Sequence, residues 1–265
     1  MKLGLCTWSY HRSLASKKLT LEAIIKMCRK DFKLDGIEII AEELPETGQE
    51  YITGLKGMAH DHGLVISSLS CTNNFGVETD GELSKAVDDV MRWIDTAELI
   101  GSTILRIFTG WAPKEKQAAL WPNIMDGISR SARYARTHKI RLAVEPHNGS
   151  GFLSTSAEAV KFIKEAASEN VKLNLDTGNY RDDDPYGAIV RSLPYTVHAH
   201  AKIRDLSGNG QDSILDYDRI LRIFKQNDYK GFLSIEYEGA KDEIECVPKA
   251  VKMMRKMLEK HDLVK

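Results

Sequence analysis

Short apolar runs recur along the chain, and most are followed by a stretch in which apolar residues repeat every three or four positions. Within the runs, apolar residues alternate with other residues, as in a strand with one covered face. In the stretches between the runs, apolar residues at every third or fourth position are typical of amphipathic helices. The predicted strands cover residues 2–8, 36–41, 64–70, 102–108, 140–145, 171–176, 196–202 and 231–236.

The stretches between the predicted strands have one apolar face. Residues 83–97 and 157–167 place their apolar side chains at helical spacing. Thr155 and Glu158 open the second of these helices with the spacing of a capping box. A last helix over residues 244–258 is expected to close the fold behind the eighth strand.

Eight strand–helix units in 265 residues predict an α/β protein with a (β/α)8 TIM barrel fold. No composition shift or Pro/Gly-rich linker divides the chain, so residues 1–265 are expected to form one domain. An open doubly wound sheet is the structural alternative. It is disfavoured because the chain has no GxGxxG after the first strand and no P-loop.

Acidic or imidazole side chains stand at the ends of the last four predicted strands. They are Glu145, Asp176, His200 and Glu236. Because side chains alternate across a strand, and the apolar residues of the other parity must face the helices, these four are expected to point into the barrel near its mouth. The sequence therefore predicts a divalent-metal site.

Three carboxylates and one imidazole make an oxygen-rich ligand set. Such a set suits Mn²⁺, Mg²⁺ or Co²⁺ better than a thiolate-preferring metal, with Zn²⁺ as a further candidate, and Mn²⁺ is our first choice. The alternative is that Glu145 and Glu236 are partners of interior cations, for which Arg141, Lys172 and Arg106 are available.

Further polar and aromatic residues are candidates for substrate binding. Lys202 and Arg204 continue the inward parity of His200 and could contact a phosphate, a carboxylate or an enolate oxygen. His147 follows Glu145 closely, and Trp8 could pack against a sugar ring. Core packing is the alternative role for Trp8, and solvated surface charge is the alternative for Arg204.

Arg106 and Glu38 both fall on the inward parity of their strands. These two side chains could pair in the floor of the barrel and only organise the site, without contacting substrate.

The charge balance of the chain limits its partners. The sequence has 37 Lys and Arg, 38 Asp and Glu, and a formal net charge of -1, so we expect no nucleic-acid partner. The four cysteines form no CxxC pair, which favours free thiols in a reducing cytoplasm. The first ten residues, MKLGLCTWSY, contain too short an apolar run for a signal peptide or membrane span. A homo-oligomer stays possible.

With these residues in place, the chain resembles the xylose isomerase-like TIM barrels, among them ketose 3-epimerases, ribulose-phosphate epimerases, hydroxypyruvate isomerases and inosose dehydratases. In that family, ligands after the fifth to eighth strands hold the metal. They correspond to Glu145 of VEPHNG, Asp176 of NLDTGNY, His200 of HAHAKIRD and Glu236 of SIEYEG. The H-x-K pattern that ends at Lys202 is similar to that of phosphosugar and inositol-acting members.

The chain departs from the ketose 3-epimerases at two positions. Those enzymes carry a second Glu six residues after the first ligand, where this chain has Gly151, and a His three residues after the Asp, where it has Asn179. Both family residues contact substrate. The resemblance therefore implies the metal centre more strongly than a particular ketose reaction.

The resemblance implies a metal-dependent isomerase or epimerase that acts on a sugar, keto-sugar or sugar phosphate through a metal-stabilised enediolate. In this reading Glu145 and Glu236 move the proton, Lys202 donates to a substrate oxygen, and Asn179 or His147 orients hydroxyls. The alternatives are a dehydratase similar to inosose dehydratase and a non-catalytic sugar-binding barrel. A trinuclear-zinc endonuclease is disfavoured because few of the eight His lie at strand ends.

Overall fold

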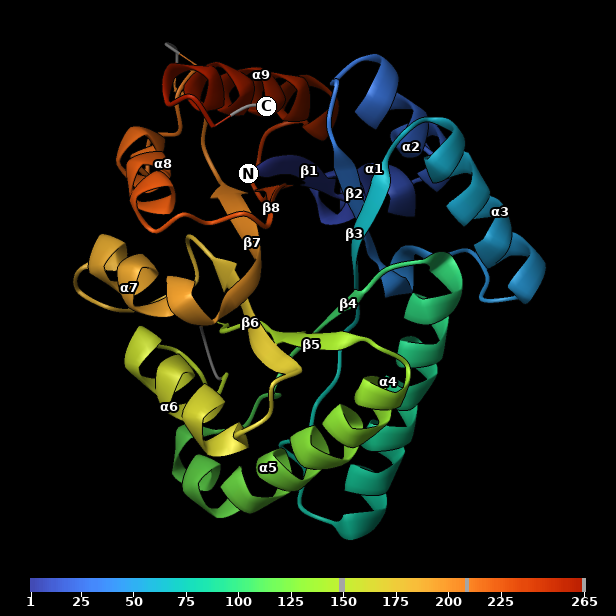
Figure 1. The fold of residues 1–265 in the computed structure, drawn as a ribbon, viewed down its shortest axis with the longest axis vertical. Helices are drawn as coiled ribbons and strands as arrows, with labels where there is room; N and C mark the ends of the chain where they lie inside the picture. Colours follow the sequence, from blue (N-terminus) through green and yellow to red (C-terminus); the bar gives the residue numbers. More distant parts are fainter. Residues whose placement is uncertain (148–150, 208–209, 264–265) are drawn as a thin grey trace.

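The computed structural model describes residues 1–147, 151–207 and 210–263. Eight parallel strands follow one another around a closed barrel, and β8 pairs with β1 to complete it (Figure 1). The strands are β1 (Lys2–Cys6), β2 (Gly36–Ile40), β3 (Val65–Ser70), β4 (Ile104–Ile107), β5 (Arg141–Val144), β6 (Val171–Asp176), β7 (Thr196–Ile203) and β8 (Phe232–Tyr237). The predicted TIM barrel is confirmed.

Helices surround the barrel in Figure 1. The α-helices are α1 (His11–Ala15), α2 (Leu21–Lys30), α3 (Gln49–Asp61), α4 (Asp80–Ile100), α5 (Lys114–Thr137), α6 (Ser156–Ala166), α7 (Pro185–Ser192), α8 (Tyr217–Gln226) and α9 (Glu243–Lys260). Short 3-10 helices are η1 (Thr7–Tyr10), η2 (Ala41–Glu43) and η3 (Leu193–Tyr195). Among the described residues, none of the helices has the length and apolar character needed to cross a membrane.

Several strand ends differ from those predicted. The first strand stops at Cys6, because the chain turns there into η1 and the Thr7 hydroxyl accepts the amide of Ile40. The fifth strand stops one residue before Glu145, although the Glu145 amide still donates to the carbonyl of Ile107. The seventh strand continues to Ile203. His200 therefore lies inside the strand and not at its end.

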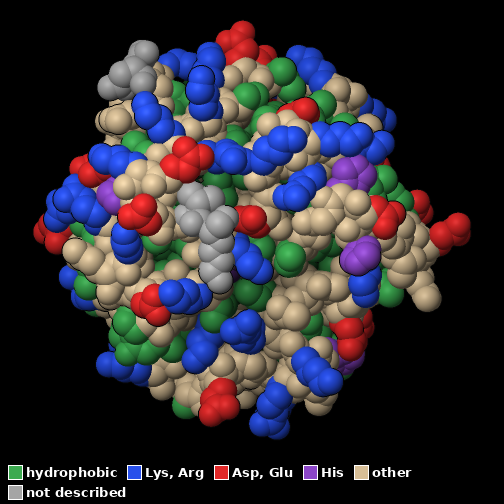
Figure 2. All heavy atoms as spheres, turned by 45° about the horizontal axis from the view of Figure 1, so that its top comes forward, with side chains coloured by type: hydrophobic (Ala, Val, Ile, Leu, Met, Phe, Trp, Pro, Cys, Tyr) green, Lys and Arg blue, Asp and Glu red, His purple; other side chains and the backbone are tan. Residues whose placement is uncertain are grey.

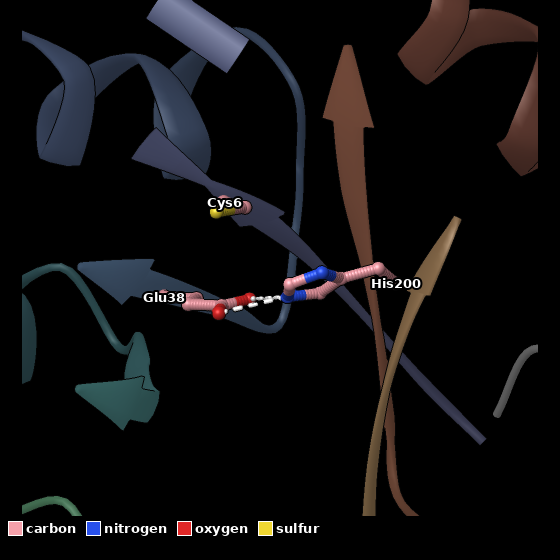
Figure 3. A group of neighbouring side chains, drawn as sticks. All are labelled: Cys6, Glu38 and His200. Atoms are coloured by element: carbon pink, nitrogen blue, oxygen red, sulfur yellow. Dashed lines mark hydrogen bonds and ion pairs between the residues drawn. The ribbon is translucent and has the colours of Figure 1, made fainter. Parts of the chain in front are cut away.

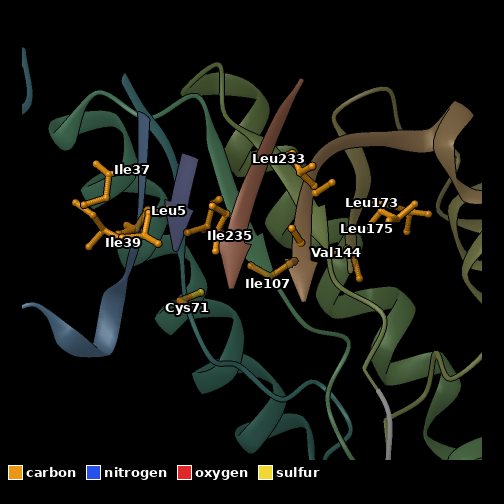
Figure 4. Packing of buried hydrophobic residues seen from close by; sticks show 14 of the residues in the cluster. Leu5, Ile37, Ile39, Cys71, Ile107, Val144, Leu173, Leu175, Leu233 and Ile235 are labelled. Atoms are coloured by element: carbon orange, nitrogen blue, oxygen red, sulfur yellow. The ribbon is translucent and has the colours of Figure 1, made fainter. Parts of the chain in front are cut away.

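Apolar side chains of one parity fill the layer between the strands and the helices (Figure 4). Leu5, Ile37, Val144, Leu173 and Ile235 are completely buried in this layer. Burial of a side chain of this size contributes about 1.5–3 kcal/mol to stability. The layer holds the other parity of each strand toward the barrel interior, where the polar side chains lie.

Several positions on the inward side of the strands carry small residues. Gly36 leaves space for the Phe232 ring, since a Cβ at position 36 would lie 2.6 Å from a ring carbon. Ser68 and Ser70 of β3 face the same interior, and both are completely buried. The interior consequently accommodates long acidic and imidazole side chains without expelling them to the surface.

The predicted helix start at Thr155 is confirmed. Its hydroxyl accepts the amide of Glu158, and the Glu158 carboxylate accepts the amide of Thr155, which completes a capping box at the start of α6. This start fixes where the chain enters the helix after the loop that follows β5.

The outer surface carries charges of both signs. On the face drawn in Figure 2, Lys and Arg side chains lie among Asp and Glu, and hydrophobic side chains show in separate small areas. The four cysteines are buried and free, as the sequence predicts.

Candidate functional site

Three carboxylates surround one imidazole nitrogen inside the barrel. The Nδ1 atom of His200 lies 3.6 Å from Glu145 Oε2, 3.6 Å from Asp176 Oδ2 and 3.4 Å from Glu236 Oε2. All four residues are buried, with at most 5% of any one exposed. The four side chains that the sequence places on one parity therefore do converge.

The buried atoms at this point fit a divalent cation. His200 Nδ1 is buried and makes no hydrogen bond, and the buried Asp176 Oδ2 and Glu236 Oε2 pair with the Lys202 ammonium. Metal bonds of about 2.0–2.2 Å bring adjacent ligand atoms to roughly 3–3.5 Å from one another, close to the separations seen here. Glu145, Asp176 and His200 also offer ligand atoms that all lie within 4.8 Å of one another. The donor set is oxygen-rich with one nitrogen.

Glu145 is held by side chains of β4, of β6 and of the loop after β6. Its Oε2 lies 3.2 Å from Arg106 Nε and accepts a hydrogen bond from Asn174 Nδ2 at 3.1 Å. Its Oε1 accepts from Asn179 Nδ2 at 3.0 Å. Burial alone would raise the pKa of Glu145, but His200 and Arg106 outweigh it and lower the pKa. The carboxylate is therefore ionised.

Arg106 does not pair with Glu38, one of the partners that the sequence allows, but with Glu145, another of them. Its Nη1 donates to the Cys71 carbonyl at 3.2 Å. Glu38 instead accepts from His200 Nε2, at 2.8 Å to one oxygen and 2.9 Å to the other (Figure 3). The long Arg106 side chain reaches past the barrel floor toward the mouth, where Glu145 is its carboxylate partner.

Lys202 lies among three carboxylates although it is only 2% exposed. Its Nζ is 3.0 Å from Asp176 Oδ2 and 3.0 Å from Glu238 Oε2, and it forms a closer ion pair with Glu236. Burial opposes the charged form, but Asp176 and Glu236 raise the pKa of Lys202 well above its ordinary value. A protonated lysine thus faces the same cluster as His200.

His200 and Glu38 form a second buried charge pair. Burial disfavours the imidazolium, yet the carboxylates of Glu236 and Glu38 raise the pKa of His200 well above its ordinary value. Burial also opposes ionisation of Glu38, but His200 and His198 lower its pKa to about 2. Glu38 is therefore a carboxylate, which accepts hydrogen bonds and cannot donate them.

A cavity of about 200 Å³ opens above the carboxylate cluster. Aromatic side chains form part of its wall, and charged residues lie between and below them. Its lining consists of Trp8, Ile40, Thr72, Arg106, Phe108, Trp111, Glu145, His147, Lys202, Glu236 and Glu238. Larger hollows on the outer surface, between α5 and α6 and between α6 and α7, contain none of the predicted site residues.

The structure places the predicted substrate-binding residues at different depths. Trp8, His147 and Lys202 line the cavity. Asn179 lies beneath it, where it donates to Glu145. Arg204 is outside the lining and donates to the Gly178 carbonyl at 3.3 Å.

Sequence reasoning missed part of the cavity wall. Phe108 and Trp111 follow β4 with ring centroids 4.8 Å apart, and both pack near the His147 ring. Glu238 accepts a hydrogen bond from Trp8 Nε1 at 3.1 Å. Glu238 could have been identified from the sequence, because it stands two residues after Glu236 and so has the same strand parity. Trp111 lies in a loop, where strand alternation predicts no direction for a side chain.

Two asparagines hold the loop that carries these aromatic residues. Asn73 exchanges two hydrogen bonds with the Phe108 main chain, each 2.8 Å long. Asn74 Oδ1 accepts the amides of Gly76 at 2.8 Å and Trp111 at 3.0 Å. These asparagines thus shape the cavity by fixing the backbone of the β4 loop.

Comparison with known proteins adds named relatives. Inosose dehydratase of Bacillus thuringiensis (strain Al Hakam) is 26% identical over 141 residues, 44% of this chain and 47% of the relative. D-psicose 3-epimerase of Agrobacterium fabrum is 26% identical over 179 residues, 63% of this chain and 62% of the relative. The chain thus spans less than two thirds of the length of these curated relatives.

A solved structure shares the whole barrel. The crystal structure of a D-psicose 3-epimerase in the presence of D-fructose superposes with a TM-score of 0.79 at 20% identity, and the match covers 98% of this chain and 97% of that one. The family model for the xylose isomerase-like TIM barrel matches residues 29–257. The chain therefore belongs to the xylose isomerase-like TIM barrel family.

Proposed function

We propose that the protein is a divalent-metal-dependent isomerase or epimerase that acts on an unphosphorylated keto-sugar. The observation that carries this proposal is the set of three carboxylate oxygens 3.4–3.6 Å from His200 Nδ1. They lie at the base of a cavity with an aromatic wall. Cavities of this kind, apolar in part and with a few convergent polar groups, are typical of small-molecule sites.

The ligands in this proposal are Glu145, Asp176, His200 and Glu236. The buried Nδ1 of His200 supports it, because this atom makes no hydrogen bond and such atoms are costly unless a cation or another partner satisfies them. Mn²⁺ is our first choice for an oxygen-rich set with one imidazole. A bound cation would stabilise the negative charge that develops on substrate oxygens when a carbon-bound proton leaves.

Glu145 and Glu236 are our candidates for moving that proton. They approach the cluster from the ends of different strands, β5 and β8. His200 and Arg106 lower the pKa of Glu145, so this side chain is ionised and can accept a proton. If two carboxylates act on opposite faces of one carbon, the result is epimerisation. If one carboxylate returns the proton to the neighbouring carbon, the result is isomerisation.

The charges of the cavity favour an uncharged substrate. Arg106 already faces Glu145, and Lys202 faces three carboxylates. A phosphate dianion is usually bound by cations that are not committed to carboxylates. The aromatic rings of Trp8 and Phe108 instead offer apolar surface against which the C–H face of a sugar can pack. Lys202 and His147 are then placed to contact its oxygens.

A dehydratase is the second candidate. Gly151 and Asn179 stand where ketose 3-epimerases carry a Glu and a His, and Asn179 here donates to Glu145. Lys202, which is charged and adjacent to Glu236, could protonate a departing hydroxyl. The same proton abstraction would then end in loss of water.

We place the protein in a reducing compartment, the cytoplasm. Its four cysteines are buried and free, so none contributes a disulfide to stability.

Metal analysis and isotope exchange test the proposal together. The purified protein is assayed for bound metal, loaded with Mn²⁺ and incubated in D2O with a panel of ketoses, keto-inositols and their phosphates. We expect one divalent cation per chain and one deuterium beside the carbonyl of an unphosphorylated substrate.

Each other outcome has a definite meaning. Loss of water with an ultraviolet-absorbing enone would replace the isomerase with the dehydratase. Turnover of phosphorylated substrates alone would refute the uncharged substrate. Metal binding without exchange on any member of the panel would leave a sugar-binding barrel that is not an enzyme.

A further inference from the structure

Glu38 contacts Nε2 of the His200 ring (Figure 3), whereas Glu145, Asp176 and Glu236 lie near Nδ1. We propose that Glu38 is a positioning residue that fixes the tautomer and orientation of His200, so that Nδ1 is the nitrogen offered to the cation. The inference rests on the proposed function, since it assumes that His200 binds the metal. Glu38 itself touches neither metal nor substrate in this account.

The contact between the two side chains is two-pronged. His200 Nε2 lies 2.8 Å from Glu38 Oε1 and 2.9 Å from Oε2, and both residues are completely buried. The Ser70 hydroxyl donates to Glu38 Oε1 at 2.6 Å. Glu38 is thus held from β3 on one side while it holds His200 of β7 on the other.

Hydrogen-bond chemistry assigns the protonated nitrogen. A carboxylate only accepts, so the nitrogen that contacts Glu38 must carry the hydrogen. A metal binds only the neutral imidazole, so the second proton of the His200 imidazolium must leave when a cation binds. The neutral ring then has one N–H, and its other nitrogen has the lone pair that binds the metal. The lone pair of His200 is then on Nδ1, which points at Glu145, Asp176 and Glu236.

A carboxylate beyond the ring also strengthens the ligand. It raises the basicity of the metal-binding nitrogen and prevents rotation of the ring, and loss of such a partner commonly weakens metal binding about 10–100-fold. Rotation matters here because the ring is in contact with carboxylates at both ends. In a flipped ring, Nδ1 would face Glu38, and another ring atom would face the three carboxylates.

The strand pairing explains why Glu38 reaches this position. The register of β2 and β3 shifts between Ile37 and Glu38, so Glu38 pairs with Ser68 and one extra residue lies in β3. Irregularities of this kind re-aim a side chain. They place Glu38 and Ser70 together in the interior, where the sequence pattern allows Arg106 as a partner.

A second cation site is the competing explanation. Cys6, Glu38 and His200 offer ligand atoms within 4.8 Å of one another. A cation there would have to displace the hydrogen from His200 Nε2 and break both contacts to Glu38. The existing hydrogen bonds favour the positioning role, and the two accounts predict different metal counts.

The test compares metal affinity in two variants of nearly unchanged size. Glu38→Gln removes the charge and keeps the shape, and we expect the Kd for Mn²⁺ to rise about 10-fold or more, with unchanged circular dichroism. Cys6→Ala changes a buried side chain near Glu38 and His200 and is the control. It should keep the wild-type Kd and one cation per chain.

Nuclear magnetic resonance of the Mg²⁺-loaded or Zn²⁺-loaded protein provides a readout independent of activity. We expect ¹⁵N spectra to show the His200 hydrogen on Nε2 in the wild type, and a mixture of tautomers in Glu38→Gln. A hydrogen on Nδ1, or an unchanged Kd in Glu38→Gln, would overturn the inference. Two cations per chain, one of them lost in Cys6→Ala, would overturn it in favour of the second site.

Failure of the proposed function would look different. A wild-type protein that binds no divalent cation refutes the metal centre itself. A wild-type protein that binds one cation, with Glu38→Gln binding it equally well, refutes only the role of Glu38.

Discussion

At the scale of single residues, Glu145 has two roles in our proposal, as a ligand and as a base. Glu145→Gln keeps an oxygen for the cation and for Asn179, but it removes the basic carboxylate beside Arg106. We expect kcat to fall at least about 100-fold with the fold intact, since a general base commonly contributes 10²–10⁴-fold. Steady-state kinetics and circular dichroism measure the two effects.

The stability of the Glu145→Gln variant is a second measurement, because Arg106 loses its carboxylate partner. Its guanidinium would be left beside a neutral amide, so some loss of stability is expected even if the fold persists. A Glu145→Gln enzyme with ordinary kcat would exclude Glu145 from proton transfer, whatever its stability.

Trp8 tests the aromatic wall. It is 37% exposed and donates to Glu238. Because Trp8 stands at the rim, away from the carboxylate cluster, Trp8→Ala should raise KM about 10-fold and leave kcat nearly unchanged, as expected for a loss of about 1.4 kcal/mol of binding. Ile244→Ala, an exposed apolar residue on α9, is the control and should alter neither constant. An equal loss of kcat would move Trp8 into the catalytic step.

At the scale of elements, alternation within strands predicts much of the structure. It identifies the eight strands and places Asp176 and Glu236 inward, because the opposite parity must meet the helices. It does not predict which interior groups pair. Arg106 pairs with Glu145 and not with Glu38, because barrel closure and the register shift between β2 and β3 set the distances between these side chains. Neither feature can be predicted from the sequence of a single strand.

Loop geometry is the other limit of the sequence reasoning. Phe108 and Trp111 enter the cavity because Asn73 and Asn74 bind the backbone of the β4 loop. Asn after a strand is common in turns, so its presence alone does not predict which side chain it directs. Strand-borne residues were therefore predicted better than loop-borne ones.

Gly36 tests the packing of the barrel floor. An added Cβ would lie 2.6 Å from the Phe232 ring and 2.6 Å from the Val65 carbonyl, and the carbonyl belongs to the strand ladder. Gly36→Ala should therefore destabilise the barrel by about 1–3 kcal/mol or more through overpacking. Urea denaturation gives the value.

Gly54 is the matched control for that substitution. It lies within α3, and an added Cβ there meets nothing within 4 Å. Gly54→Ala should stabilise the protein by about 0.5–1 kcal/mol, because alanine favours the helix. Equal effects of the two substitutions would mean that the space around Gly36 is not restrictive.

At the scale of the whole molecule, the buried His198 and the half-buried Glu43 make stability depend on pH in opposite directions. Burial lowers the pKa of His198 from 6.5 to about 4. Burial likewise raises the pKa of Glu43 from 4.5 to about 7. Between pH 4.5 and 6.5, the unfolded chain therefore takes up the proton at His198, while the folded chain holds the proton at Glu43.

The sign of each contribution follows from which state binds the proton. The contribution of His198 is fully present above pH 6.5 and is lost as pH falls toward 4, by about 3 kcal/mol for the full shift. The contribution of Glu43 has the opposite sign, because its raised pKa favours the folded state as pH falls from 7 toward 4.5. In the wild type the two slopes offset each other.

Single substitutions should separate these slopes. His198→Gln lacks the loss of stability that protonation of His198 causes at acid pH. Its free energy of unfolding, relative to that of the wild type, should therefore rise as pH falls from 6.5 to 4.5. Glu43→Gln lacks the gain in stability that protonation of Glu43 gives at acid pH. Its free energy of unfolding, relative to that of the wild type, should therefore fall over the same range. Urea midpoints of the metal-free proteins at the two pH values measure both. If the two variants change in the same direction, then at least one of these groups does not titrate as its burial requires.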